Sequence, residues 1–219
     1  MRNVDVLTMR LCDTPSSNAP IRSINLEISI LTPMSASNLT RSGLPIDEIL
    51  EDLKRQFRQA DQVVLQAPPG AGKTTIVPLA LFAEAWLADK KILVLEPRRI
   101  AAKSAAIRMA SLLSEPVGET VGYRMRLETK VSKSTKIEVI TEGILARMLQ
   151  QDPALEQAGL VIFDEFHERN LDSDVALALC LKGRSIFRDL QPLKLLVMSA
   201  TLDSKKVADL IDAPVVTSQ

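Results

Sequence analysis

The chain has 219 residues, 46% of them hydrophobic and 25% charged, and its formal net charge is zero. This composition can build one folded domain with a full core, and it excludes a strongly basic protein dedicated to nucleic-acid binding. Its two cysteines, Cys12 and Cys180, lack metal-ligand spacing, so they are expected to be reduced thiols. The apolar runs contain neither a membrane span nor a signal peptide, and we expect a cytoplasmic protein without membrane contact.

Residues 1–43 differ from the rest of the chain. They are rich in Ser, Thr, Asn and Pro, and regular apolar residues are confined to 24–31, where a short strand is expected. We interpret the segment as a poorly ordered N-terminal extension, and Met34 as an alternative natural start of the protein. The folded domain is expected to span residues 44–219.

Periodic apolar residues begin near residue 45 and continue to the end of the chain. Helical spacing is first seen at Ile46, Ile49, Leu50, Leu53 and Phe57. Strands are then expected at 62–66, 92–95, 120–124, 136–141, 160–163, 195–198 and 215–217. Helices are expected at 74–87, 142–150 and 174–181, with another that follows Arg99 and ends at Leu113. Apolar strands that alternate with helices predict an α/β fold, a doubly wound parallel sheet with helices on both faces.

A glycine-rich segment with a lysine and two threonines follows the first strand. It reads Ala67-Pro68-Pro69-Gly70-Ala71-Gly72-Lys73-Thr74-Thr75. The glycines let the backbone turn its N–H groups towards a polyphosphate at the start of a helix. Lys73 would then reach the β- and γ-phosphates, and the Thr74 hydroxyl would bind Mg²⁺. An ordinary tight turn into a helix is the alternative, since Ala67 stands where this pattern usually has its first glycine.

An acidic pair, Asp164 and Glu165, follows the apolar run at 160–163. In a parallel sheet, the carboxyl ends of the strands are where ligands bind. An acid there can hold Mg²⁺, and its neighbour can orient a water molecule. A solvated strand end would explain the pair alone. Both motifs in this order, each after its own strand, predict a nucleoside triphosphatase.

Positive charge is concentrated between Lys90 and Lys136. This stretch holds eleven Lys and Arg residues against four Asp and Glu residues. A solvated face is the usual explanation of such a cluster, but several of these residues fall beside expected strand ends, where a nucleic-acid backbone could bind them.

Four further motifs stand at expected strand ends. They are Glu96-Pro97-Arg98-Arg99-Ile100-Ala101-Ala102, Val121-Gly122-Tyr123-Arg124-Met125-Arg126, Thr141-Glu142-Gly143 and Ser199-Ala200-Thr201. With the glycine-rich loop and Asp164-Glu165-Phe166-His167-Glu168-Arg169, they resemble the first motor domain of the DEAH/RHA helicases of superfamily two. The resemblance covers about residues 44–219 and implies a RecA-like P-loop NTPase domain.

The resemblance implies a role for each motif in the ATP site. Lys73 and Thr74 match the phosphate and Mg²⁺ ligands, Asp164 the residue that holds the Mg²⁺ shell, and Glu165 the residue that orients the attacking water. His167, the only histidine, matches the residue that couples this site to Ser199-Ala200-Thr201, with a structural histidine as the alternative.

Arg108 matches the arginine that stacks on adenine in this family. A salt-bridged arginine on a helix surface is the alternative for this residue.

The nucleic-acid contacts implied by the resemblance lie along the basic strand ends. They are Pro97, Arg98, Arg99, Arg124, Thr141 and Gly143. Arginine side chains and helix N-termini bind phosphates without reading sequence, which suits a motor that moves along a single strand. RNA is the expected polymer, although no residue that reads a 2′-OH can be named.

The family places a second RecA-like domain, with arginine fingers, after the first. We therefore expect a domain of this kind beyond Gln219 in the full-length parent. Without arginine fingers, turnover falls by about 10³ to 10⁵ in comparable systems, so the chain alone is expected to bind Mg-ATP and hydrolyse it weakly. A catalytically inert nucleotide- or RNA-binding fragment and a non-helicase P-loop ATPase, such as a small kinase, are the alternatives.

Overall fold

The computed structural model describes residues 43–168, 170–188, 191–201 and 204–218. The strand expected at 24–31, the rest of the N-terminal extension and Arg169 lie outside the described residues, so the boundary at residue 44 stays a prediction. No helix in the described part of the chain is both long and apolar enough to cross a membrane.

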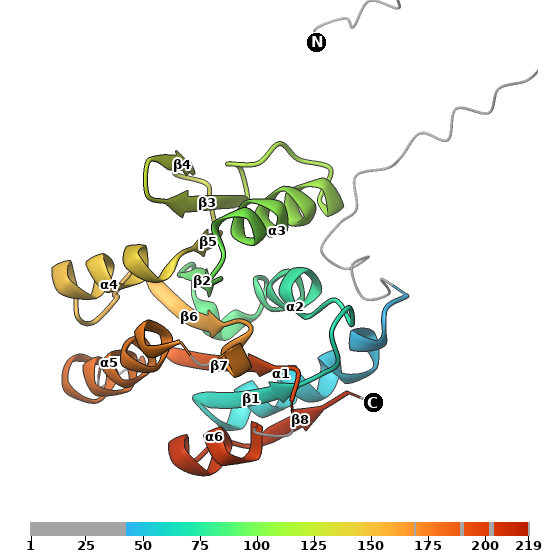
Figure 1. The fold of residues 1–219 in the computed structure, drawn as a ribbon, viewed down its shortest axis with the longest axis vertical. Helices are drawn as coiled ribbons and strands as arrows, with labels where there is room; N and C mark the ends of the chain where they lie inside the picture. Colours follow the sequence, from blue (N-terminus) through green and yellow to red (C-terminus); the bar gives the residue numbers. More distant parts are fainter. Residues whose placement is uncertain (1–42, 169, 189–190, 202–203, 219) are drawn as a thin grey trace, which may run out of the picture. The chain divides into compact units, whose positions relative to one another are not determined.

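The described residues form one eight-stranded sheet, with the strand order β4-β3-β5-β2-β6-β7-β1-β8 (Figure 1). The strands are β1 Gln62–Gln66, β2 Lys91–Leu95, β3 Val121–Met125, β4 Glu128–Lys130, β5 Ile137–Ile140, β6 Ala158–Phe163, β7 Lys194–Ser199 and β8 Val215–Thr217. All neighbouring strands are parallel except β3 and β4, which are antiparallel. The predicted parallel sheet is confirmed, and β4 is an edge strand that the sequence did not indicate.

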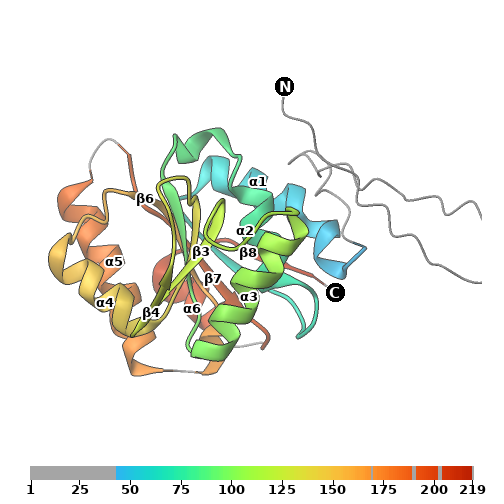
Figure 2. The same cartoon turned by 90° about the horizontal axis from the view of Figure 1, so that it is seen from above.

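Helices cover both faces of this sheet (Figure 2). The helices are η2 Pro45–Ile49, α1 Leu50–Gln59, α2 Lys73–Leu81, η3 Ala85–Leu87, α3 Arg99–Leu112, α4 Glu142–Gln151, η4 Phe166–Glu168, α5 Leu171–Phe187 and α6 Ser204–Ile211. One apolar core lies under α1, α2 and α3, and the other under α4, α5 and α6. Side chains alternate between them along each strand, so Val63 and Leu65 enter the first core and Val64 the second.

Two helices differ in length from the prediction. The helix expected at 74–87 ends at Leu81, because the backbone at Glu84 is extended and separates α2 from the short helix η3. The helix expected at 174–181 runs from Leu171 to Phe187, and its first turn is capped by the Asn170 side chain, which accepts from the Asp172 N–H at 3.0 Å. Helix α6 was not predicted.

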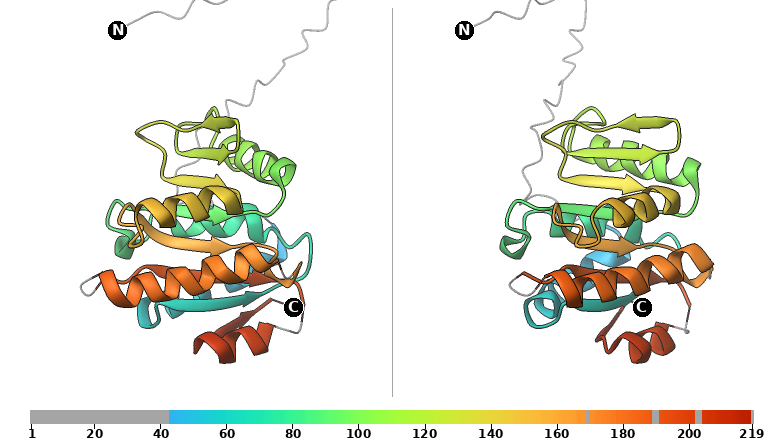
Figure 3. Two further views of the ribbon diagram at one scale, coloured as in Figure 1. Left: turned by 60° about the vertical axis from the view of Figure 1, so that its left-hand side comes forward. Right: turned by 90° about the vertical axis from the view of Figure 1, so that its left-hand side faces the viewer.

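The ends of the parallel strands meet at one edge of the sheet, as Figure 3 shows from the side of α4 and α5. Backbone hydrogen bonds join successive ends at this edge. Ala67 N–H donates to the Ser199 carbonyl at 3.1 Å, Asp164 N–H to Leu95 at 3.0 Å, and Glu96 N–H to Ile140 at 3.0 Å. The motifs predicted to follow the strands therefore lie side by side.

Candidate functional site

The loop between β1 and α2 has the conformation that its glycines allow. Gly70 and Gly72 have φ angles of +78° and +94°, which residues with a Cβ rarely adopt. A Cβ at Gly72 would also lie 2.7 Å from the Leu44 side chain. Ile46 N–H donates to the Ala71 carbonyl at 3.3 Å, so η2 supports the loop. The loop therefore has a fixed shape at the start of α2.

Lys73 is the first residue of α2 and is buried within this loop. Its ammonium group donates to the carbonyl oxygens of Ala67 at 2.9 Å and Pro68 at 3.1 Å. Gly72 precedes the helix and has no side chain to cap it, so the start of α2 is open to an anion. A lysine beside an open helix N-terminus forms a cradle for a polyphosphate.

Asp164 lies beside this cradle, at the end of β6, with a side chain that is almost fully buried. One carboxylate oxygen, Oδ1, accepts from the Glu165 N–H at 2.9 Å, and the Thr74 side chain lies near enough to the carboxylate to affect its pKa. The other oxygen, Oδ2, is buried and has no hydrogen-bond partner among the described residues. Burial raises the pKa of Asp164 to about 6, although the nearby Thr74 hydroxyl acts in the opposite direction.

This arrangement fits a divalent cation. A buried carboxylate oxygen without a partner is costly, and a hard cation that prefers oxygen ligands would satisfy it. The nearby Thr74 hydroxyl provides a second oxygen ligand. The residues predicted to hold Mg²⁺ are therefore brought together.

Glu96 is a second buried acid at this edge, and its sequence motif predicted no role for it. Burial raises its pKa to about 8, and repulsion from Asp164 contributes to this shift. A hydrogen bond from the backbone of Arg98 opposes these effects. Glu96 is therefore largely protonated at neutral pH. The signal in the sequence was an acid directly after an apolar strand, the same signal that identified Asp164.

Glu165 and His167 connect this edge to β7. Glu165 has a φ angle of +48°, a backbone conformation that is uncommon for residues other than glycine. Nδ1 of His167 lies 3.4 Å from the Glu165 carboxylate and accepts from the Ala200 N–H at 3.4 Å. When Nδ1 carries no proton, it can accept a hydrogen bond from the Ala200 N–H. When Nδ1 carries the proton, it can donate to the Glu165 carboxylate. The ring can therefore exchange one partner for the other.

The segment Ser199-Ala200-Thr201 lies between the histidine and the phosphate loop. The Ser199 hydroxyl accepts from the Thr201 N–H at 3.3 Å, which closes a tight turn after β7. The Ser199 carbonyl accepts from Ala67 at the start of the phosphate loop. A chain of direct contacts thus runs from His167 through this segment to the loop.

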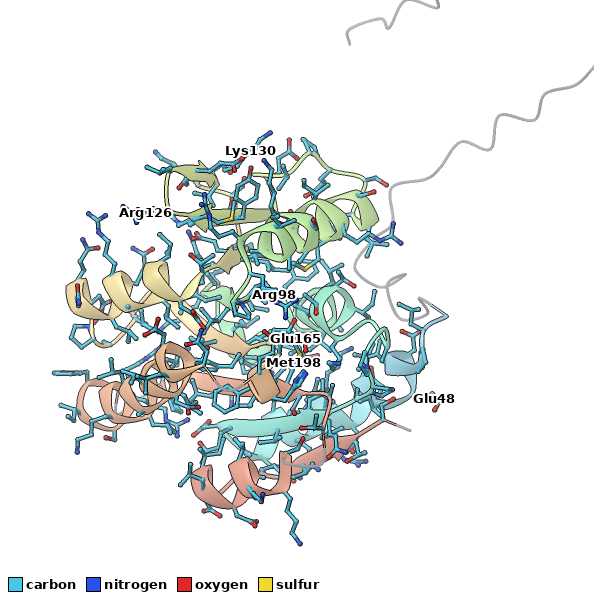
Figure 4. The ribbon with its side chains drawn as sticks, viewed as in Figure 1. Glu48, Arg98, Arg126, Lys130, Glu165 and Met198 are labelled. Carbon is cyan, nitrogen blue, oxygen red and sulfur yellow. The ribbon has the colours of Figure 1, made fainter. Side chains whose placement is uncertain are left out.

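Two arginines stand where β2 leads into α3. The Arg98 side chain is 70% exposed and pairs with Glu168 at 2.5 Å, while Arg99 donates to the Arg126 carbonyl at 3.0 Å. Pro97 precedes them and is half-buried. Arg98, Glu165 and Met198 lie together at the centre of Figure 4, where the ends of β2, β6 and β7 meet.

The N-terminus of α4 lies along the same edge, after β5. Thr141 is the residue before the helix, and its side chain makes no capping bond. A Cβ at Gly143 would have no heavy atom within 4 Å, so the first turn is open. Glu142 accepts from Asn170 at 2.9 Å and from the Ser173 hydroxyl at 2.7 Å, which fixes α4 to α5. The open helix end is therefore held in place.

Arg124 is placed differently from the other predicted nucleic-acid residues. Tyr123 enters the core under α3, so the alternation along β3 directs Arg124 to the face that carries α4. There its Nε donates to the buried Glu138 carboxylate at 2.5 Å. Arg124 therefore lies on the sheet face under α4 and not at the edge where Arg98 and Arg99 stand, which does not support it as a nucleic-acid contact. The exposed Arg126, which the sequence analysis did not select, lies beside Arg99 instead.

Arg108 is exposed on α3. It forms no ion pair with the residues that the structure describes, so the salt-bridged alternative has no partner among them. Its predicted contact with adenine stays a prediction.

The phosphate loop, the acidic strand end and the order of the strands define the class of protein. The chain belongs to the DEAD/DEAH box helicase family, whose model matches residues 47–210. Among known proteins, it is 51% identical to the ATP-dependent RNA helicase HrpB of Escherichia coli over 179 residues, which are 81% of this chain and 22% of that protein.

Other relatives agree with this assignment. The chain is 37% identical over 195 residues to prp22 of Schizosaccharomyces pombe, a pre-mRNA-splicing factor ATP-dependent RNA helicase, covering 89% of this chain and 16% of that protein. The crystal structure of Escherichia coli DEAH/RHA helicase HrpB superposes with a TM-score of 0.76 at 51% identity, over 80% of this chain and 22% of that one. The chain therefore spans about a fifth of the length of the relatives it matches.

Proposed function

We propose that this chain is the ATP-binding motor domain of an ATP-dependent RNA helicase. One observation carries the proposal: a buried oxygen of Asp164 has no hydrogen-bond partner among the described residues, and it lies near Thr74 and the phosphate loop. The names of the relatives support the class of reaction.

In the proposed site, the loop backbone and Lys73 bind the phosphates of ATP. For this, the Lys73 ammonium group exchanges its bonds to the Ala67 and Pro68 carbonyls for phosphate oxygens. Thr74 and Asp164 hold Mg²⁺, partly through water, and a bound Mg²⁺ neutralises charge on the transferred phosphoryl group. The nucleotide contacts are Pro69, Gly70, Ala71, Gly72, Lys73, Thr74, Thr75 and, at the base, Arg108.

Glu165 is proposed to orient the attacking water. Its side chain is 31% exposed and lies next to the cation ligand Asp164, so it can reach both solvent and the phosphates. His167 and the segment Ser199-Ala200-Thr201 are proposed to couple this site to nucleic acid, because their contacts join η4 to the phosphate loop through β7.

Single-stranded RNA is proposed to bind along the ends of β2, β3 and β5. The N-termini of α3 and α4, neither of which has a side-chain cap, lie at this edge with three exposed arginines. Such groups bind phosphates without reading bases. The contacts are Pro97, Arg98, Arg99, Thr141 and Gly143, with Arg126 in the place first given to Arg124.

A second RecA-like domain is proposed to complete the site in the longer parent protein. The arginine fingers of that domain would add positive charge at the γ-phosphate. Translocation would follow from alternate closing and opening of the two domains, and the chain alone would be weakly active.

Nucleotide binding tests the proposal most directly. Mg-ATP should stabilise the chain by about 2.7 kcal/mol at a hundredfold excess over Kd, measured as a shift of the thermal midpoint. Lys73→Ala should abolish the shift, and Lys205→Ala, an exposed lysine of α6, should retain it. An unchanged midpoint of the wild type at millimolar Mg-ATP would exclude the proposed function.

A second measurement, of ATP hydrolysis, distinguishes a motor domain from a catalytically inert binding fragment. RNA should stimulate the weak ATP hydrolysis of the chain, and Glu165→Gln should remove hydrolysis while the Mg-ATP shift remains.

A further inference from the structure

The sheet face under α4 changes from apolar to ionic at β5. Residues of β2, β6 and β7 on this face, such as Leu93, Val161 and Leu195, belong to the apolar core. On β5 the position paired with Leu93 is Glu138, and on β3 Arg124, which is paired with Ile140, reaches Glu138 from two residues beyond Gly122. A pocket of about 510 Å³ lies here, between α4 and strands β2, β3 and β5. It also reaches the first residues of β2 and β6, at the opposite ends of those strands from the phosphate site.

The acidic groups of this pocket already have partners. Glu138 is almost fully buried, and its two oxygens accept from Lys91 at 2.5 Å and Arg124 at 2.5 Å. These bonds lower the pKa of Glu138, although burial acts in the opposite direction. Asp152 accepts from the N–H groups of Ala154 at 3.1 Å and Glu156 at 2.7 Å, so both of its oxygens hold the turn after α4.

The cationic groups of the pocket have donors to spare. Among the described residues, the three N–H bonds of the Lys91 ammonium group have one partner, Glu138, and the five of the Arg124 guanidinium group reach Glu138 with one bond from Nε and one from Nη2. Arg147 of α4 also lines the pocket, and its side chain makes no hydrogen bond or ion pair with any residue that the structure describes. The unmet hydrogen-bonding capacity is therefore mainly that of donors.

One wall of the pocket is apolar. Ile144 and Met148 of α4 are half-buried, and Leu155 is buried in the core below them. Arg147 lies on the same helix as Ile144 and Met148, so spare cationic donors and apolar carbons line the pocket together. Such a pocket matches a ligand that has an anionic group and an apolar body.

We propose that this pocket binds a small organic anion, in which a carboxylate or phosphate group meets Arg147, Lys91 and Arg124 and an apolar body packs on Ile144 and Met148. Arg147 provides the planar pair of donors that such anions prefer. The site is separate from the proposed nucleotide site and does not depend on it.

Three probes of similar shape test the proposal. Benzoate and phenyl phosphate carry the two anionic groups, and benzamide is the neutral match of benzoate. Titrations are followed by the NMR signal of the Met148 methyl group. Benzoate, phenyl phosphate or both should shift this signal in a saturable way at millimolar concentration, and benzamide should not. The stronger of the two anions identifies the group that the pocket prefers.

Variants then locate the binding. Arg147→Gln should weaken the bound anion about tenfold, as expected for the loss of a charge-assisted hydrogen bond, while the control Arg55→Gln should have no effect. Lys73→Ala should leave the titration unchanged, which separates this site from the phosphate loop. Equal shifts with benzoate and benzamide, no saturable shift with either anion, or equal affinity of wild type and Arg147→Gln would overturn the proposal.

Discussion

Two buried acids of the sheet show opposite chemistry. Glu138 on β5 has a partner for each oxygen, and its pKa is lowered. Asp164 after β6 keeps one buried oxygen without a partner among the described residues, and its pKa is raised to about 6. The difference shows that burial alone does not identify a functional carboxylate. A buried acid whose oxygens are both paired stabilises the fold, whereas a buried acid with an unpaired oxygen can still bind a ligand.

The largest expected effect is a loss of stability when Glu138, the acid with paired oxygens, is replaced. Glu138→Ala should reduce the free energy of unfolding by about 3 kcal/mol, because it leaves two cations without the acid that holds them. Glu138→Gln should cost less, since the amide oxygen still accepts a hydrogen bond. Denaturant titration gives both values. A loss below about 1 kcal/mol for the alanine variant would mean that water replaces the carboxylate without penalty.

The second prediction uses the pH dependence of stability. Because the pKa of Asp164 is higher in the folded state, about 6 against an ordinary value of 3.8, its contribution is present below pH 4 and is lost as the pH rises through 6. Without divalent cations, Asp164→Asn should remove this loss, a difference of about 2 kcal/mol between pH 4 and 7. Denaturant titrations of both proteins across this pH range measure it.

Glu138 should show the opposite sign. Its pKa is lowered on folding, so its contribution is present above the unfolded value and is lost as the pH falls. Glu138→Gln should therefore flatten the acidic limb of the stability profile, and Asp164→Asn the limb above pH 4. The same limb flattened by both variants would contradict the comparison.

A smaller effect, on RNA affinity, is expected from the exposed arginines Arg98 and Arg99. If Arg98 and Arg99 contact phosphates, the double change to Glu should weaken single-stranded RNA binding about tenfold, while the Mg-ATP shift remains. The wild type should also lose affinity with salt, with a log–log slope of about −0.7 per contact. Fluorescence anisotropy at two salt concentrations measures both. Equal affinity for both proteins would leave the arginines as a solvated face.

The smallest effect concerns the partner of Arg98. Exposed ion pairs contribute about 0 to 1 kcal/mol, so the bond to Glu168 can be displaced by a phosphate. Glu168→Gln should remove this competitor and tighten RNA binding about two- to fivefold, with little change in stability. The same anisotropy assay detects it. Weaker binding of this variant would show that Glu168 positions Arg98 rather than competes for it.

The sequence predicted the strands and motifs well because their signals are local. Apolar runs such as 160–163 and the glycines at 70 and 72 can be recognised from neighbouring residues alone, without knowledge of distant contacts. The helix α5 is longer at both ends than the expected 174–181, and it continues through Gly183. In the structure this glycine is needed where a Cβ would lie 2.3 Å from the Pro153 carbonyl, a contact that no local pattern reveals.

The site was predicted less completely, for two physical reasons. The alternation along β3, with Tyr123 in the core, could have shown that Arg124 faces the other side of the sheet. The ionic partner of Arg124, however, is Glu138 on β5, the parallel neighbour of β3, and only the pairing of these strands in the sheet brings the two residues together. The high pKa of Glu96 likewise depends on burial and on Asp164, sixty-eight positions away along the chain.

The short antiparallel strand β4 also affects how the protein behaves at high concentration. Exposed strand edges recruit other chains, and β3 would be such an edge if β4 did not pair with it. β4 itself has only three residues, Glu128-Thr129-Lys130, two of them charged, and such an edge is a poor template for another strand. This strand is therefore expected to protect the domain from aggregation, and a hairpin that opens would expose the apolar sheet to self-association.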